Sequence, residues 1–174
     1  MAYADIWRKG GNYVPAGSWY AVIFWFSAQT GHRSSALSDG LAYQMLERFR
    51  PAFFLRTETE QAALWNIFTF CLRKSAHMAS YFILAWLLMW AIRKWFGSCH
   101  RASVIFLLCA VLAALDEFHQ TFVPGRSGQF RDVLIDLIGA GVFLLLWAVC
   151  RSFDRLRGHS RGRRSGLGHM HRGG

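Results

Sequence analysis

Residues 102–150 read ASVIFLLCAVLAALDEFHQTFVPGRSGQFRDVLIDLIGAGVFLLLWAVC and decide the fold of this chain. Two apolar runs, Ala102–Leu115 and Val133–Cys150, stand on either side of a polar segment that contains Pro124 and Gly125. A membrane-spanning helix needs about 20 mostly apolar residues, and fewer when its polar ends reach the interface. Proline followed by glycine favours a tight turn. The stretch therefore predicts two membrane-spanning helices joined by a polar turn.

Two further apolar runs extend this prediction to four spans. Val14–Gln29 follows a basic flank and resembles a secretory signal, but no small-x-small cleavage site follows it closely, so we expect it to remain as a span. Ala76–Ile92 is the other run. The predicted fold class is all-α: a polytopic membrane helix bundle with four transmembrane helices plus one or two interfacial helices.

The composition excludes several other classes of protein. Of the 174 residues, 53% are hydrophobic and 17% are charged, and the mean hydropathy is +0.20. A soluble domain carries about a quarter charged residues, and a disordered chain lacks so many large apolar side chains. The length predicts a single domain. The four cysteines are scattered among apolar runs, which argues against a secreted disulfide scaffold.

The positive charge lies on one side of the predicted membrane. The N-terminal segment, the loop of residues 93–101 and the tail from Arg151 together carry the whole formal net charge of +10. The charges of the two other loops, residues 30–74 and 116–136, sum to zero. By the positive-inside rule, both termini are cytoplasmic, and the protein is a multi-pass protein of the cell (inner) membrane.

These boundaries divide the chain into three parts. Residues 1–13 are predicted to be a cytoplasmic N-terminus, residues 14–150 the membrane domain, and residues 151–174 a disordered Arg/Gly-rich cytoplasmic tail. We expect the tail to contact anionic lipids of the inner leaflet, and we expect no nucleic-acid partner. The positive-inside rule already accounts for the charge of the tail.

The outer loop between the first two spans contains two candidate interfacial helices, Leu41–Phe54 and Thr59–Leu72. The second is equally consistent with an outward extension of the span that begins near Ala76. No residue between Glu60 and Ile92 breaks a helix.

Ionisable and amide side chains gather at the outer face of the predicted bundle. Such groups are costly at membrane depth, so each one indicates a candidate site. Lys74, His77 and Tyr81 share one helix face because their spacing is i, i+3, i+7. The outer ends of the other spans and the turn between the last two add Gln29, Asp116, Glu117, Gln120, Arg126, Asp132 and Asp136.

Three motifs resemble the VanZ-like family of small membrane proteins: FSAQTG from Phe26, KSAHMASY from Lys74 and DEFHQTFVPGRSGQFRDVLIDLIGAG from Asp116. Members of that family often carry Asn where this chain has Asp136. Founding members are linked to low-level resistance to teicoplanin, a lipid-bearing glycopeptide. The resemblance therefore implies recognition or modification of an amphiphilic cell-envelope ligand, with glycopeptide resistance as a consequence.

The predicted site supports a binding role in which Lys74 and Arg126 hold an anionic headgroup. Gln29, Tyr81 and Gln120 would orient neutral parts of the same ligand. Membrane lipids and a lipid-linked or lipidated envelope molecule are the partners that this role implies.

Two other interpretations of the same residues stay open. In an enzyme, His77 and Glu117 act as base and acid or as a hydrogen-bonded pair, and Asp132 supplies a second carboxylate. In a structural cluster, the charges only satisfy one another. His77, Glu117, His119 and Asp132 are competent metal ligands, but no HExxH or paired-cysteine spacing is present, so we expect no metal and no cofactor.

Overall fold

Five α-helices and one short 3₁₀ helix make up the part of the chain that the computed structural model describes, residues 13–93 and 97–167. The side chains at 98, 99, 156 and 158–167 are outside that description. The elements are α2 (Val14–Ser27), α3 (Gly31–Phe49), η1 (Pro51–Leu55), α4 (Glu58–Ala91), α5 (Ser98–Gln120) and α6 (Phe130–Leu167). These ranges contain no β-strand. The all-α prediction is confirmed.

The helix boundaries follow from local sequence. The Thr30 side chain accepts a hydrogen bond from the backbone N–H of Arg33 at 3.4 Å and so caps the start of α3. Pro51 follows the end of α3, because proline cannot continue a helix. Between α5 and α6, Gly125 adopts a φ of 74°, a backbone conformation that favours glycine. The predicted Pro-Gly turn is therefore present.

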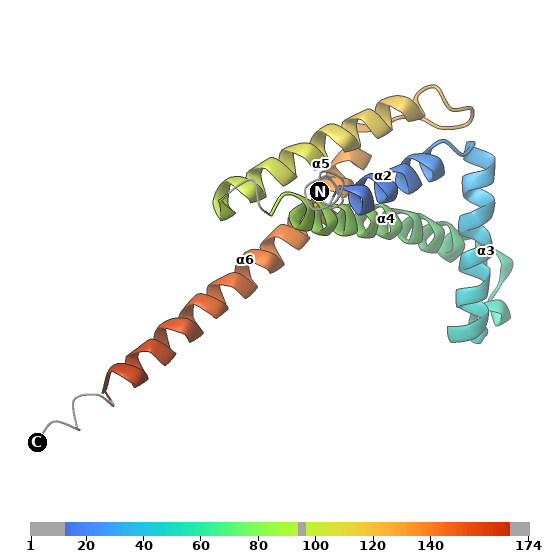
Figure 1. Cartoon of the computed structure of the whole chain (residues 1–174). Helices are drawn as coiled ribbons and strands as arrows, with labels where there is room; N and C mark the ends of the chain where they lie inside the picture. Colours follow the sequence, from blue (N-terminus) through green and yellow to red (C-terminus); the bar gives the residue numbers. More distant parts are fainter. Residues whose placement is uncertain (1–12, 94–96, 168–174) are drawn as a thin grey trace, which may run out of the picture.

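α4 and α6 run in the same direction and form the longest helix pair of the bundle (Figure 1). The Phe82 and Phe143 rings pack edge to face with their centroids 5.4 Å apart. One helical turn earlier on each helix, Gly139 lies directly against the Met78 backbone, where a Cβ atom would stand 2.1 Å from the carbonyl oxygen. α5 and α2 complete the bundle, and the buried core includes Tyr81, Leu84, Ile105, Cys109 and Ala140.

The outer loop resolves into α3, η1 and the first half of α4. α3 crosses the end of the bundle where α2 finishes (Figure 1). Residues 59–72 form no separate helix but belong to α4, which continues without interruption from Glu58 to Ala91. Of the two alternatives for this segment, the outward extension is therefore the one observed.

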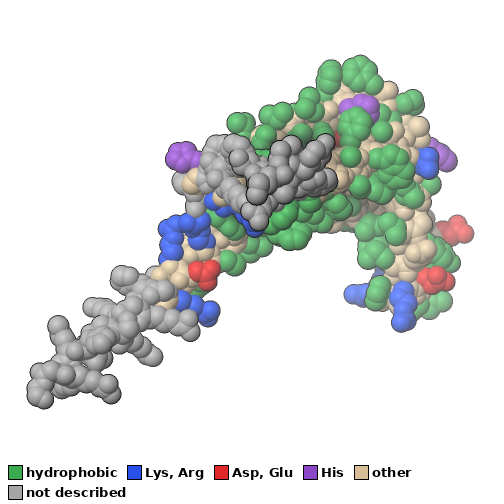
Figure 2. All heavy atoms as spheres, in the orientation of Figure 1, with side chains coloured by type: hydrophobic (Ala, Val, Ile, Leu, Met, Phe, Trp, Pro, Cys, Tyr) green, Lys and Arg blue, Asp and Glu red, His purple; other side chains and the backbone are tan. Residues whose placement is uncertain are grey.

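α5 and α6 are long and apolar enough to cross a membrane by length and composition, over His100–Gln120 and Phe130–Arg155. Only 28% of each apolar window is buried in the bundle, unlike the core helix of a soluble protein. On α5, Leu107, Val111 and Leu115 form an exposed apolar stripe. Figure 2 shows apolar side chains covering most of this face of the bundle. The fold is that of a membrane protein.

The other two predicted spans do not meet the same criteria. α2 has 14 residues, which is shorter than a full span. α4 is long enough, but its apolar part shares the helix with Arg73, Lys74 and His77, which lower the mean hydropathy. Two spans are therefore supported directly, while the four-span arrangement stays a prediction.

α6 continues past Cys150, where we predict the membrane domain to end, and reaches Leu167, beyond the other helices (Figure 1). Residues 151–157 contain no proline or glycine that would stop a helix, so the first part of the Arg/Gly-rich segment is helical. Residues 1–12 and 168–174 lie outside the described part of the chain.

Two glycines of α6 provide a matched test of the α4–α6 packing. In Gly139→Ala the new methyl group meets the Met78 backbone, so we expect a loss of stability of about 1 to 3 kcal/mol from overpacking. In Gly141→Ala the methyl group meets nothing within 4 Å, so the higher helix propensity of alanine gives unchanged or increased stability. Thermal unfolding of the purified protein in detergent measures both. Equal melting temperatures would contradict the observed packing.

Candidate functional site

Eight polar side chains lie together where α4, α5 and α6 meet the α5–α6 turn. This polar cluster consists of Lys74, His77, Asp116, Glu117, Gln120, Arg126, Asp132 and Asp136. Asp116 and Asp136 are fully buried, and Glu117 and Gln120 are 4% exposed. The structure therefore brings together the ionisable groups that the sequence placed at one membrane face. Buried charges of this kind require partners.

Two pairs connect α4 to α6. The Lys74 ammonium forms an ion pair with the Asp132 carboxylate, and both side chains are largely buried. The His77 Nδ1 atom lies 3.4 Å from Oδ1 of Asp136. The enzyme interpretation has His77 and Glu117 act as base and acid or as a hydrogen-bonded pair, and the structure pairs His77 with Asp136. His77 faces α6 at the height of Asp136, one turn below Asp132, whereas Glu117 is on α5.

Gln120 connects two carboxylates to an arginine. Its amide nitrogen donates to Oδ2 of Asp116 at 3.2 Å and to Oε1 of Glu117 at 3.3 Å. Its amide oxygen accepts a hydrogen bond from Nη1 of Arg126 at 3.0 Å. The second Glu117 oxygen, Oε2, accepts from the backbone N–H of Gln129 at 2.9 Å, just before α6 begins. Glu117 and Gln120 thus fix the turn and the start of α6.

The α5–α6 turn is also fastened to the junction of α2 and α3. Nη2 of Arg126 donates to the backbone oxygen of Phe26 at 3.4 Å, and the N–H of Gly31 donates to the Pro124 oxygen at 3.1 Å. A Cβ atom on Gly31 would stand 2.0 Å from the oxygen of Gly125, so a side chain there would separate the two segments. Burial lowers the pKa of Arg126, which nevertheless stays charged at neutral pH.

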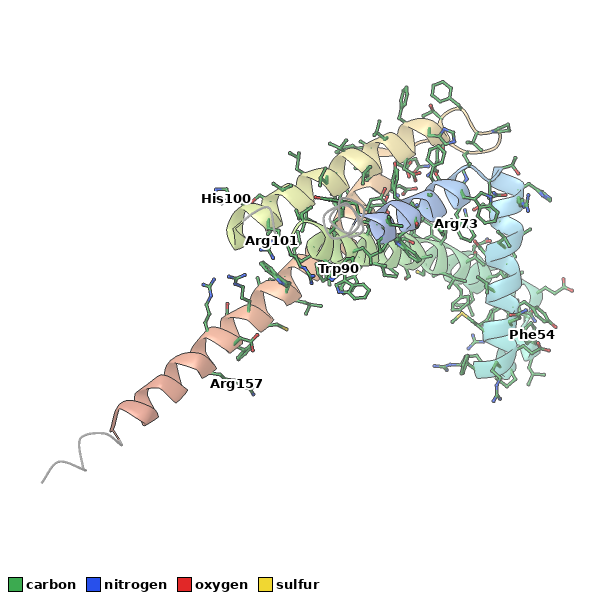
Figure 3. All side chains as sticks on the ribbon, viewed as in Figure 1. Phe54, Arg73, Trp90, His100, Arg101 and Arg157 are labelled. Carbon is green, nitrogen blue, oxygen red and sulfur yellow. The ribbon has the colours of Figure 1, made fainter. Side chains whose placement is uncertain are left out.

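A cavity of about 330 Å³ opens beside the polar cluster, between α2, α3 and α4. Its apolar wall includes Val22, Ile23, Phe26, Leu37, Leu41 and Leu72. Its ionisable lining residues are Arg73, His77, Asp116 and Arg126. Figure 3 labels Arg73, which lies on α4 near the junction of α2 and α3. A cavity lined by both apolar and charged side chains suits an amphiphilic molecule.

Only three of the eight residues predicted for the site line this cavity: Gln29, His77 and Arg126. The Gln29 amide donates to the backbone oxygen of Trp25 at 3.0 Å and so binds its own helix. Lys74, Glu117, Gln120 and Asp132 lie in the polar cluster away from the cavity wall. Tyr81 is fully buried in the core, and no described residue forms a hydrogen bond with its hydroxyl oxygen. Its side chain is therefore not positioned to contact a molecule in the cavity.

Three residues of the polar cluster or the cavity wall have no role in the interpretations drawn from the sequence. Arg73 lines the cavity, although we took its neighbour Lys74 as the binding cation. Asp116 also lines it, and its i, i+4 spacing to Gln120 was a signal that could have identified it. Asp136 is the partner of His77. Among the side chains that the structure describes, no three His, Cys, Asp or Glu are grouped as metal ligands.

The Lys74–Asp132 ion pair can be tested with a double-mutant cycle. We expect Lys74→Gln and Asp132→Asn each to lose about 1 to 3 kcal/mol of stability, because each leaves a partly buried charge without its partner. The double variant should lose less than the two single losses combined. Thermal unfolding in detergent provides the free energies.

Asp154→Asn is the control, because this exposed carboxylate is also on α6. Its stability should stay within about 0.5 kcal/mol of the unsubstituted protein. Purely additive single losses would show that Lys74 and Asp132 do not interact.

Comparison with known proteins agrees with this architecture. No curated protein and no solved structure matches the chain. A family model described as VanZ/LLP1 matches residues 13–151, which include α2 to α5, the membrane part of α6 and the whole polar cluster. The resemblance that the three sequence motifs indicated is confirmed. The chain belongs to the VanZ/LLP1 family.

Proposed function

We propose that this protein recognises an amphiphilic molecule of the cell envelope in the cavity between α2, α3 and α4. The observation that carries the proposal is the chemistry of the cavity wall. Apolar side chains of α2 and α3 line the cavity together with Arg73, His77, Asp116 and Arg126. Apolar walls accept hydrocarbon, while a few charged groups fix the orientation of the ligand.

The size of the cavity restricts what it encloses. About 330 Å³ is at the lower end of the range for small-molecule sites. The cavity takes a headgroup and the first part of an acyl or prenyl chain, and it is too small for a whole lipoglycopeptide. Teicoplanin carries an acyl chain, so a role in teicoplanin resistance is compatible with a site that binds lipid. In this proposal, resistance follows from handling of an envelope lipid.

The proposal includes a four-span topology with the cavity outside the cytoplasm. Arg93 lies over the Trp90 ring at 5.3 Å, and Arg151 lies over the Trp147 ring at 5.4 Å. Arg93, two residues past the end of α4, follows Lys74 by 19 residues, and Arg151 of α6 follows Asp132 by 19 residues. At 1.5 Å per residue this is about 28 Å, close to the thickness of the hydrocarbon core.

These Trp–Arg pairs therefore support a second membrane interface opposite the polar cluster. Figure 3 shows Trp90, His100 and Arg101 toward one end of the bundle and Arg73 toward the other. The positive-inside rule assigns the arginine-rich end to the cytoplasm.

Single cysteines test this topology. In a background without the four native cysteines, we expect Ser127→Cys in the α5–α6 turn to react with an impermeant thiol reagent on intact cells. Gly97→Cys should react only after the membrane is permeabilised. Both positions are exposed, and neither substitution meets the close backbone contact that surrounds Gly128. The reverse labelling pattern would place the polar cluster and cavity on the cytoplasmic side.

A bulky side chain in the cavity tests recognition. Ser38→Trp on α3 fills the cavity, so we expect less lipid to co-purify per mole of folded protein. We also expect the teicoplanin resistance that the protein confers to fall. Gly40→Trp is the control, because Gly40 is an exposed α3 residue outside the cavity wall and a Cβ atom there would meet nothing within 4 Å. Mass spectrometry of lipid extracts and the minimal inhibitory concentration at equal membrane abundance are the measurements. Equal lipid content and equal resistance in the two variants would contradict a ligand-binding cavity.

A second candidate function is enzymatic, and the position of His77 favours it. His77 lines the cavity and has the fully buried Asp136 behind its Nδ1 atom. A carboxylate in that position orients an imidazole for proton transfer. The lipid extracts described above distinguish the functions. A lipid product that disappears in His77→Asn while lipid binding persists would identify an enzyme, whereas an unchanged profile would identify a binding protein.

A further inference from the structure

Two arginines line the same cavity from different parts of the chain. Arg73 comes from α4, and Arg126 comes from the α5–α6 turn. Within the described part of the chain, neither forms an ion pair with a carboxylate. The neighbouring cation Lys74 differs, because Asp132 neutralises it. The two guanidinium groups that line the cavity are therefore not each paired with a carboxylate.

Arg73 retains unused hydrogen-bonding capacity. Its Nη2 atom donates to the Ser35 hydroxyl oxygen at 3.3 Å, while its buried Nε atom has no acceptor among the residues that the structure describes. A buried donor without a partner is costly, so this group favours an acceptor that is supplied from outside the chain. A neutral serine hydroxyl leaves the charge of Arg73 uncompensated.

Most of the nearby carboxylates are engaged away from the cavity. Asp132 binds Lys74, Glu117 accepts from Gln120 and the Gln129 backbone, and Asp136 is buried behind His77. Asp116 is the carboxylate that reaches the cavity wall, and Gln120 donates to it. Arg73 also contributes to lowering the pKa of Arg126, as expected for two neighbouring cations that repel each other. An anion between them would relieve this repulsion.

We infer that Arg73 and Arg126 bind the phosphate headgroup of a membrane lipid, whose hydrocarbon chain lies along the apolar wall of α2 and α3. This inference rests on the proposed function, since it names the class of amphiphile that the cavity takes. A guanidinium group donates two parallel hydrogen bonds to phosphate, and phosphate has enough oxygens to accept from two arginines. The site differs from the predicted one because Arg73 replaces Lys74 as the second cation.

The experiment compares two lipids that differ only in the phosphate, dioleoyl phosphatidic acid and dioleoylglycerol, and it includes inorganic phosphate as a third probe. Binding to the purified full chain in detergent is measured by native mass spectrometry. We expect the protein to bind phosphatidic acid at least about tenfold more tightly than either other probe.

Variants then assign this preference to the arginines. Arg73→Gln should reduce phosphatidic acid affinity about tenfold and leave dioleoylglycerol binding unchanged, and Arg73→Lys should lose less because it keeps the charge. Arg131→Gln is the matched control, since it removes an exposed positive charge at the same end of the bundle, outside the cavity wall. The melting temperature of each variant verifies folding. Equal losses of phosphatidic acid affinity in Arg73→Gln and Arg131→Gln would show that the effect depends only on the net positive charge, and would overturn the inference.

The remaining outcomes separate this inference from the function on which it rests. Equal binding of the two lipids, unaffected by Arg73→Gln, would overturn the phosphate site and leave amphiphile recognition in place. Inorganic phosphate that binds as tightly as phosphatidic acid would show a site for free phosphate and overturn the lipid assignment. Failure of both lipids to bind the unsubstituted protein would contradict the proposed function itself.

Discussion

The ion pair between Lys74 and Asp132 fixes the relative height of α4 and α6. A buried charge requires a partner, so the two helices meet where these largely buried side chains lie. Because the helices run in the same direction, the contacts then follow turn by turn, from Met78 against Gly139 to Phe82 against Phe143. The position of the pair thereby determines which side chains reach the cavity.

The remaining polar groups are arranged by the same requirement. Glu117 and Asp116 share the amide of Gln120, and the backbone N–H of Gln129 satisfies the second oxygen of Glu117. These bonds hold the turn between α5 and α6, and the turn carries Arg126 to the end of α2. Structural and functional roles are therefore not exclusive here, since the network that satisfies the Glu117 carboxylate also positions a cation at the cavity.

Much of this architecture could be predicted from the sequence, because membrane depth limits the choices. The apolar runs from Ala102 to Cys150 gave α5 and the membrane part of α6, and the outer-face positions of the ionisable residues gave the polar cluster. Pairing partners were harder to predict. Asp132 and Asp136 are one turn apart on the same face, and the sequence does not show which of them meets His77. That choice depends on the axial shift between two helices.

The cavity could not be predicted, because it depends on the direction in which α3 leaves the end of α2. The contact of Gly31 with Gly125 sets that direction, and it joins segments that are distant in sequence. Arg73 was missed for the same reason. Periodicity shows that Arg73 and His77 lie on neighbouring turns of one helix face. Arg73 becomes part of the cavity wall only because α3 covers that face.

The continuity of α4 has a mechanical consequence. Its first sixteen residues, from Glu58 to Arg73, extend about 24 Å at 1.5 Å per residue, and they belong to the same unbroken helix as His77. α4 is therefore a lever whose first arm packs against α3 and whose second arm packs against α6. A tilt of the first arm would move the arginine and the histidine together and change the width of the cavity.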